Sequence, residues 1–236
     1  MRPALAVAVK AVIPAMPAMV VIPVLMAGCW SEGPSVSTDV STRDMTLQVV
    51  VRGDADRTLV HVSVVGPRSL VSLIEGDRLV ARVGGAEIGM THRPDDDSYE
   101  ASLDAGVVDI GIGLQRSPPD EPAEIVIGMP PATTITIAPQ ASRGEPLTVT
   151  WTPSEGPHTT TLAVTGTCLP VTSRTLAVDP GTYTFLPADL AGASTETCSA
   201  TVTLTRALVV QATPPPLMGT YGSATQTATT NFESTP

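Results

Sequence analysis

Short runs of apolar and β-branched residues, separated by turn residues, recur along the chain from residue 45 to its end. Apolar and polar positions alternate within many of these runs. In the run 58–65, for example, Val60, Val62 and Val64 fall on one face. This period of two predicts strands that bury one face. No stretch has a convincing helical period, so the pattern predicts an all-β fold.

The expected strands fall into two groups, separated by the Gly-Met-Pro-Pro stretch at 128–131. Gly84 and Gly85 lie between two strands of the first group and favour a hairpin there. The number and spacing of the strands suit two β-sandwich domains, at 44–130 and 131–236. Strands are expected at 45–52, 58–65, 78–83, 86–90, 99–103, 107–114, 123–127, 134–137, 147–151, 160–165, 174–178, 182–186, 198–206 and 224–232.

The N-terminus has a different pattern. Arg2 and Lys10 precede an uncharged, apolar stretch at 11–27 that ends in small residues. This layout is that of a signal peptide, here at 1–28. A permanent transmembrane anchor is the weaker alternative, because three prolines interrupt the apolar stretch and each removes a helical hydrogen bond. These prolines are Pro14, Pro17 and Pro23.

The sequence Leu-Met-Ala-Gly-Cys at 25–29 resembles the lipobox of bacterial lipoproteins, with Met26 in the place where Leu is commonest. The resemblance implies cleavage between Gly28 and Cys29 by the lipoprotein export and processing machinery. It also implies diacylglycerol on the Cys29 thiol and, in a Gram-negative host, a fatty acyl chain such as palmitate on the new amino group. The alternative is an ordinary secretory signal with a chance cysteine. Trp30, in place of Asp, favours the outer over the inner membrane.

Residues 30–43, after the lipidated cysteine, are rich in Ser, Thr, Gly and Pro. Such a composition is typical of a flexible linker. We therefore expect 29–43 to form a lipidated tether between the membrane and the first sandwich.

Cys168 and Cys198 are the other two cysteines. Two thiols in an oxidising compartment favour a disulfide, which would stabilise the fold by about 3–4 kcal/mol. A metal site would need further ligands, and no histidine is close in sequence to either cysteine. A catalytic thiol would need a base, and the nearest histidine, His158, lies in a polar, loop-like stretch.

A Gly-containing turn precedes a strand that ends in Trp151, within the stretch 137–153. This stretch resembles the opening of immunoglobulin-like and fibronectin-type domains. Residues 131–236 as a whole are similar to the C-terminal module of uncharacterised lipoproteins from GC-rich Gram-negative bacteria. The resemblance implies an immunoglobulin-like sandwich and brings no activity. It departs from antibody domains in that Trp151 precedes both Cys168 and Cys198.

Charge and composition exclude some classes of partner. Without Arg2 and Lys10 the chain has 11 basic against 23 acidic residues, a formal charge of −12. Such a surface repels nucleic acid and anionic lipid. Only seven residues are aromatic, whereas sugar-binding platforms and base-stacking surfaces normally need several together. The membrane is therefore expected as a partner through the lipid alone, and no particular protein or glycan partner is indicated.

Candidate chemistry is sparse. Asp95, Asp96 and Asp97 form the densest acidic cluster and are weak candidates for Ca²⁺ ligands, but their spacing is not that of an EF-hand and favours a solvated loop. Gly111-Ile-Gly113 lacks the third glycine of a nucleotide loop and is interpreted as part of a strand. The three histidines are scattered, and neither Gly-x-Ser-x-Gly nor His-Glu-x-x-His occurs.

The sequence thus predicts two immunoglobulin-like β-sandwiches behind a signal peptide and a tether. The predicted function is that of a lipid-anchored envelope protein, without catalysis or cofactor, that serves as a binding or structural module. Contacts would be made by the loops at the ends of the sandwiches. One alternative is a Ca²⁺-dependent or carbohydrate-binding adhesion module, suggested by the acidic loop. A second is a secreted hydrolase, which would need Ser, His and an acid to converge in one pocket.

Overall fold

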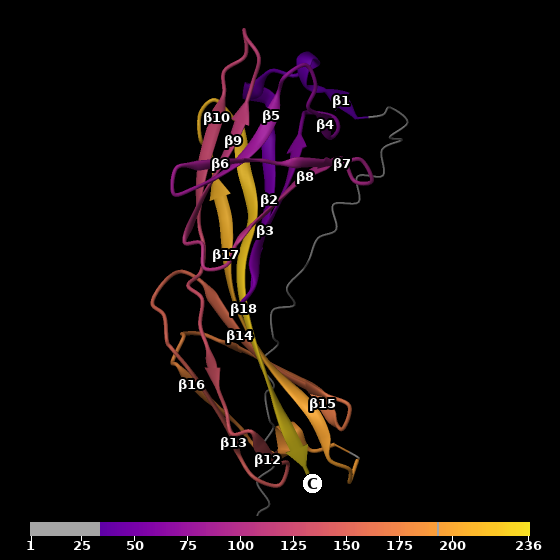
Figure 1. The fold of residues 1–236 in the computed structure, drawn as a ribbon, viewed down its shortest axis with the longest axis vertical. Coiled ribbons are helices and arrows are strands. Elements are labelled where there is room, and N and C mark those ends of the chain that lie inside the picture. Colours follow the sequence, from indigo (N-terminus) through magenta and orange to yellow (C-terminus); the bar gives the residue numbers. More distant parts are fainter. Residues whose placement is uncertain (1–33, 193) are drawn as a thin grey trace, which may run out of the picture. The chain divides into compact units, whose positions relative to one another are not determined.

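The computed structural model describes residues 34–192 and 194–236 (Figure 1). Strands make up most of these residues, which confirms the prediction of an all-β sandwich fold. No helix within the described ranges is both long and apolar enough to cross a bilayer. The predicted signal peptide, its cleavage site after Gly28 and the lipidation site Cys29 lie outside the described residues.

Two sheets enclose the first hydrophobic core. The strands of the smaller sheet have the spatial order β10-β9-β5-β6 and are β5 (Arg78–Val83), β6 (Ala86–Gly89), β9 (Asp109–Gln115) and β10 (Ala123–Gly128). The facing sheet contributes β2 (Thr46–Gly53), β3 (Arg57–Val65), β7 (Thr91–Arg93) and β8 (Ser98–Asp104). Val49, Val62 and Ile112 are wholly buried between the two sheets, as the alternating pattern predicts.

The second core also lies between two sheets. One has the order β11-β13-β16 and consists of β11 (Ile135–Thr136), β13 (Leu147–Trp151) and β16 (Thr182–Phe185). The other contains β14 (Thr159–Gly166), β15 (Leu169–Leu176) and β12 (Gln140–Ser142), which pairs with the last strand of the chain. A short helix, α1 (Pro187–Leu190), follows β16 in the sequence. Leu147, Val149 and Trp151 face this core, as predicted.

Two long strands, β17 (Cys198–Ala212) and β18 (Gly219–Thr235), belong to both sandwiches (Figure 1). They pair in antiparallel fashion along their whole length. Val202 and Phe232 pack in the second core, whereas Val210 and Ala224 pack in the first. In addition, β18 pairs in parallel with β2, so one nine-stranded sheet runs through both sandwiches.

The predicted domain boundary between residues 130 and 131 therefore does not separate the two cores. Residues 207–212 and 219–223 lie outside the ranges predicted to be strand, which are 198–206 and 224–232. Pairing between β17 and β18, and between β18 and β2, extends both strands into the first sandwich. Tertiary pairing here outweighs the local pattern.

The expected tether is wrong for residues 34–43, which fold onto the first sandwich. β1 (Ser35–Val36) pairs in parallel with β4 (Val71–Ser72), and two 3-10 turns follow at Ser37–Asp39 and Thr42–Asp44. Ser and Thr are typical of linkers, but here their hydroxyls bond to the sandwich. The Ser37 hydroxyl accepts from the N–H of Ile74 at 3.1 Å, and the Thr42 hydroxyl donates to the carbonyl of Glu121 at 2.9 Å.

The Gly84-Gly85 hairpin is confirmed. It joins β5 to β6, and both glycines have positive φ angles, 57° and 86°. Glycine adopts this region without the steric cost that a Cβ would bring, which explains why the turn forms at this pair.

Candidate functional site

The three consecutive carboxylates of the acidic loop turn toward different partners. Asp97, in a left-handed conformation at φ 50°, accepts a hydrogen bond from the Ser72 hydroxyl at 2.8 Å and lies 2.8 Å from His92 Nε2. Asp95 pairs with Arg93 at 3.2 Å, and the hydrogen bond from that guanidinium lowers the pKa of Asp95. Within the described ranges no three His, Cys, Asp or Glu side chains converge to hold a metal ion.

Ser72, His92 and Asp97 are the side chains nearest to a hydrolytic arrangement, but their order is not that of a triad. In a triad the histidine lies between the hydroxyl and the carboxylate, so that it can accept the hydroxyl proton. Here the Asp97 carboxylate lies between the other two, and the Ser72 hydroxyl donates to both of its oxygens at 2.8 Å. The arrangement fixes the loop, and the serine donates to the carboxylate and not to the histidine.

The predicted disulfide between Cys168 and Cys198 is confirmed. It joins the residue before β15 to the first residue of β17, across a sequence separation of 30. Beside it lies the buried side chain of Arg143, which donates to the carbonyls of Ser194 and Glu196 at 2.9 and 3.0 Å. The disulfide and Arg143 together fix the segment that leads into β17.

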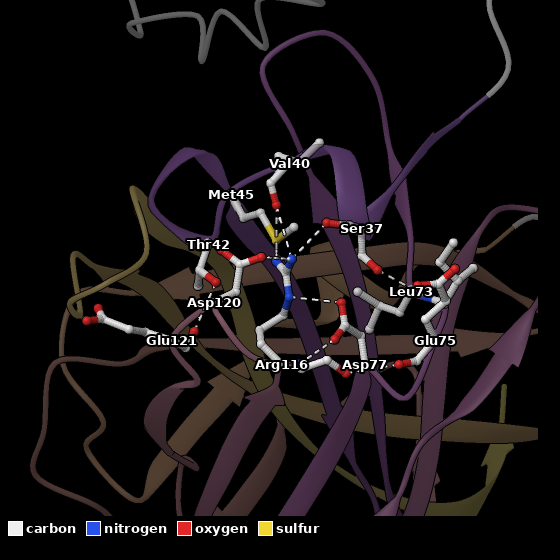
Figure 2. Close-up of polar contacts among 12 residues, drawn as sticks. Ser37, Val40, Thr42, Met45, Leu73, Glu75, Asp77, Arg116, Asp120 and Glu121 are labelled. Carbon is white, nitrogen blue, oxygen red and sulfur yellow. Dashed lines mark hydrogen bonds and ion pairs between the residues drawn. The ribbon is translucent and has the colours of Figure 1, made fainter.

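Arg116 holds the N-terminal segment against the first sandwich (Figure 2). Its side chain is 1% exposed, and its Nη2 donates to the carbonyl of Ser37 at 2.7 Å and to that of Val40 at 3.2 Å. Two carboxylates balance its charge: Asp77 lies 2.9 Å from Nε and Asp120 lies 2.7 Å from Nη2. A single buried cation thus joins the segment 37–40 to the loop before β5 and to the loop between β9 and β10. We call this group the Arg116 clamp.

Another buried arginine, Arg206, fixes the chain at the second core. Arg206, on β17, donates to Asp179 at 2.8 Å and to the backbone carbonyls of Pro131 and Thr152 at 2.7 and 2.6 Å. Burial raises the pKa of Asp179, but hydrogen bonds from Trp151 and the charge of Arg206 outweigh it, and the pKa is lowered on balance. Asp179 is therefore a buried, ionised partner for the arginine.

His158 lies at the same cluster, where its Nε2 is 3.5 Å from the Asp179 carboxylate. The other two histidines, His61 and His92, are on β3 and β7 at the first sandwich. The structure therefore does not bring the three histidines together. Each histidine lies beside an aspartate side chain, and these contacts help to hold loops in place.

Within the nine-stranded sheet, one edge of β18 is left open between two partner strands. β17 pairs with β18 along one edge of the latter. On the opposite edge, β2 pairs with residues 219–226 of β18 and β12 pairs with residues 233–235. Between them, residues 227–232 have no strand partner on this edge among the described residues. We call this stretch the β18 gap.

A cleft of about 870 Å³ lies beside the β18 gap. Its walls are formed by residues 225–230 of β18, by the turn at 53–56 and by residues 132–135 before and within β11. Threonines dominate the adjoining face of the sheet. Thr203 is opposite Thr229, and the hydroxyls of Thr205 and Thr227 lie 3.5 Å apart across the two strands. The site thus offers backbone groups and hydroxyls on β18, with Arg52, Asp54 and Asp56 in the opposite wall and no aromatic side chain in the lining.

Comparison with known proteins assigns the chain to no family. No protein-family model matches the chain, and no curated protein matches it. The solved structures similar to it include a segment of two fibronectin type-III domains from chicken tenascin and the adhesin InvE of Yersinia pseudotuberculosis.

The tenascin segment is 15% identical, with 79% of this chain and 97% of that chain covered and a TM-score of 0.29. The adhesin is 14% identical, with 82% and 59% covered and a TM-score of 0.23. At these scores the similarities support no inference about function.

The sequence analysis missed the buried arginines Arg116 and Arg206, although a signal was present. Ile110, Ile112 and Leu114 face the first core, and Arg116 continues their alternation by one step. Arg206 follows Val202 and Leu204 in the same way. An arginine at the inward phase of a strand has to find a buried partner, because an unpaired buried charge is costly.

Proposed function

We propose that this chain is a lipid-anchored protein of the bacterial cell envelope and that its β-sandwiches form a non-catalytic binding or structural module. The sequence Leu-Met-Ala-Gly-Cys at 25–29 supports the anchor. The disulfide between Cys168 and Cys198 fits an oxidising compartment outside the cytosol. Trp30, in place of Asp, supports the outer membrane as the destination.

The observation that best supports this role is the short distance in sequence between Cys29 and the start of the first sandwich. Ser35, whose N–H donates to the carbonyl of Leu70 at 3.0 Å, is only six positions after Cys29. Six residues span at most about 20 Å. A lipid on Cys29 would therefore hold the first sandwich directly at the bilayer surface. The negative surface charge means that the acyl chains, and not the protein surface, would provide the attachment.

The experiment is to express the full chain and its Cys29→Ser variant in a Gram-negative host and to separate membranes from soluble periplasm. We expect the wild type in the membrane fraction, with a mass that includes three acyl chains on a chain beginning at residue 29. Cys29→Ser should appear in the soluble fraction. Ser31→Ala, two residues further on, is the matched control and should stay with the membrane. A Cys29→Ser chain that remains membrane-bound would contradict the anchor.

The binding role is supported by how the polar side chains are used. The histidines and the acidic loop are engaged in contacts within the fold, whereas the β18 gap leaves backbone groups free beside a cleft. Incubation with chromogenic ester, peptide and glycoside substrates should give no turnover above the rate without protein. Turnover that is lost in Ser72→Ala or His92→Ala would contradict the non-catalytic role.

A further inference from the structure

The direction of the backbone groups in the β18 gap follows from two hydrogen bonds just beyond its end, at residues 233 and 235. The N–H of Glu233 donates to the carbonyl of Pro139, and the carbonyl of Thr235 accepts from the N–H of Arg143, both at 2.9 Å. Residues 233 and 235 therefore point their backbone groups away from β17. Because these directions alternate along a strand, and the pairing with β17 has no register shift, Thr227, Thr229 and Asn231 point theirs into the gap.

These groups are unpaired. Among the described residues no hydrogen bond joins the N–H or C=O of Thr227, Thr229 or Asn231 to another part of the chain on that side. Thr227 and Thr229 line the cleft, so two donors and two acceptors face it in the spacing of a strand edge, and those of Asn231 lie one step beyond. Such an edge is a template for pairing with another extended chain.

Three other edge strands of the same molecule are protected against such pairing. β7 is three residues long and contains His92 and Arg93, β15 contains Pro170 and Arg174, and β6 contains Glu87. Charges, proline and short length are the usual means by which proteins block edge pairing. The β18 gap has none of these, because no charged residue occurs between Arg206 and Glu233.

β17 has a second open stretch at 208–212, beyond the end of its pairing with β14. That stretch has a paired strand at one end only, and none of its residues lines the cleft. The β18 gap is limited at both ends, by β2 and by β12, and is therefore a slot of defined length. Its six residues span about 20 Å, room for an extended segment of about five residues.

We propose that the β18 gap binds an extended, uncharged peptide segment of a partner protein by strand addition, as the specific form of the binding role proposed above. Alternate side chains of the peptide would face Ala228 and Ile135, which favours small apolar residues. The others would lie beside Thr227 and Thr229, which favours Thr, Ser or Asn. Hydrogen bonds to the backbone of β18 would supply affinity, and this alternation would supply selectivity.

The probe is a capped pentapeptide of alternating threonine and valine. It is titrated into the purified full chain with the substitution Cys29→Ser, which removes the predicted lipid and keeps this test independent of the anchor. Two control peptides have N-methyl groups on the threonines or on the valines. A bound strand directs only alternate N–H groups at its neighbour, so one control should bind at least about tenfold more weakly and the other should retain binding.

The protein side is tested with two substitutions at one position. Thr229→Pro removes an N–H that points into the gap and not toward β17, so the strand pair should persist while peptide binding is lost. Thr229→Ala changes the side chain only and should bind as the wild type does. Thr227→Pro repeats the test, and hydrogen exchange of the β17 amides checks that each variant is folded.

Hydrogen exchange measures the protection of the backbone amides in the β18 gap directly. In the free protein the amides of Thr227, Thr229 and Asn231 should exchange faster than those of Ala228 and Thr230, and the peptide should slow them. The proposal is overturned if these amides are protected without peptide, if no peptide binds at millimolar concentration, if both methylated peptides bind equally, or if Thr229→Pro binds normally. None of these results bears on the attachment of lipid to Cys29.

Discussion

The Arg116 clamp gives a quantitative prediction for Arg116→Ala. The substitution leaves the Asp77 carboxylate, which is 3% exposed, without its cation, and it frees the carbonyls of Ser37 and Val40. Removal of one partner from a buried ion pair costs about 3–5 kcal/mol, because the remaining charge stays out of water. Since a domain is typically stable by only about 5–15 kcal/mol, the variant should lose a large share of its stability.

The assay has a global and a local part. Urea unfolding followed by circular dichroism gives the change in the free energy of unfolding. Hydrogen exchange then shows whether the N-terminal segment has detached. The amides of Ser35, Val40 and Met45, which bond to Leu70, Ser37 and Thr42 respectively, should lose protection before the strands of the core do.

Arg43→Ala is the matched control, since it removes an arginine from the same segment. Arg43 is 75% exposed and lies 3.7 Å from Glu121, which is also mostly exposed, so little or no change is expected. If Arg116→Ala and Arg43→Ala have equal stability, the buried clamp does not hold the segment. Unchanged protection of Val40 in Arg116→Ala would refute the reasoning as well.

Three further predictions concern other parts of the fold. Replacement of both Cys168 and Cys198 by serine should lower the free energy of unfolding by about 3–4 kcal/mol in urea titrations, and an equal effect of reductant on the double variant and the wild type would contradict this. The pKa of Asp179 is lowered in the folded state, so its stabilising contribution is complete above pH of about 4 and is lost as the pH falls through the folded-state pKa. Stability should therefore decline less steeply below pH of about 4 in Asp179→Asn, as measured by urea midpoints between pH 2.5 and pH 5. Calorimetry with Ca²⁺ should give no heat and no melting shift, because both oxygens of Asp97 are engaged by Ser72; a shift that Asp97→Asn removes would revive the adhesion alternative.

Much of the fold was predictable from the alternating pattern alone. The expected range 78–83 coincides with β5 and 147–151 coincides with β13, and the two faces of β3 are as predicted. In these strands one face is buried, so the alternation of apolar and polar residues in the sequence indicates which side chains are buried. The two-residue and three-residue strands β1, β4, β7 and β12 were missed, because so few positions establish no alternation.

The candidate site was not predictable in this way. The parallel pairing of β18 with β2 joins residues more than 170 positions apart, as in the hydrogen bond from the Thr225 hydroxyl to the carbonyl of Val51. Nothing local in either strand indicates that partner. The β18 gap follows from where that pairing stops, at Gln226, and from where β12 begins, at Gln140. Such a site exists only after the long-range pairing is known.

The shared hairpin of β17 and β18 has a consequence for biogenesis. Because β18 completes both sandwiches, neither core is complete until residues 219–235 have been synthesised, and such distant pairings form slowly. A chain truncated before Gly219 would lack a strand of both sandwiches, so neither core should form as it does in the full chain.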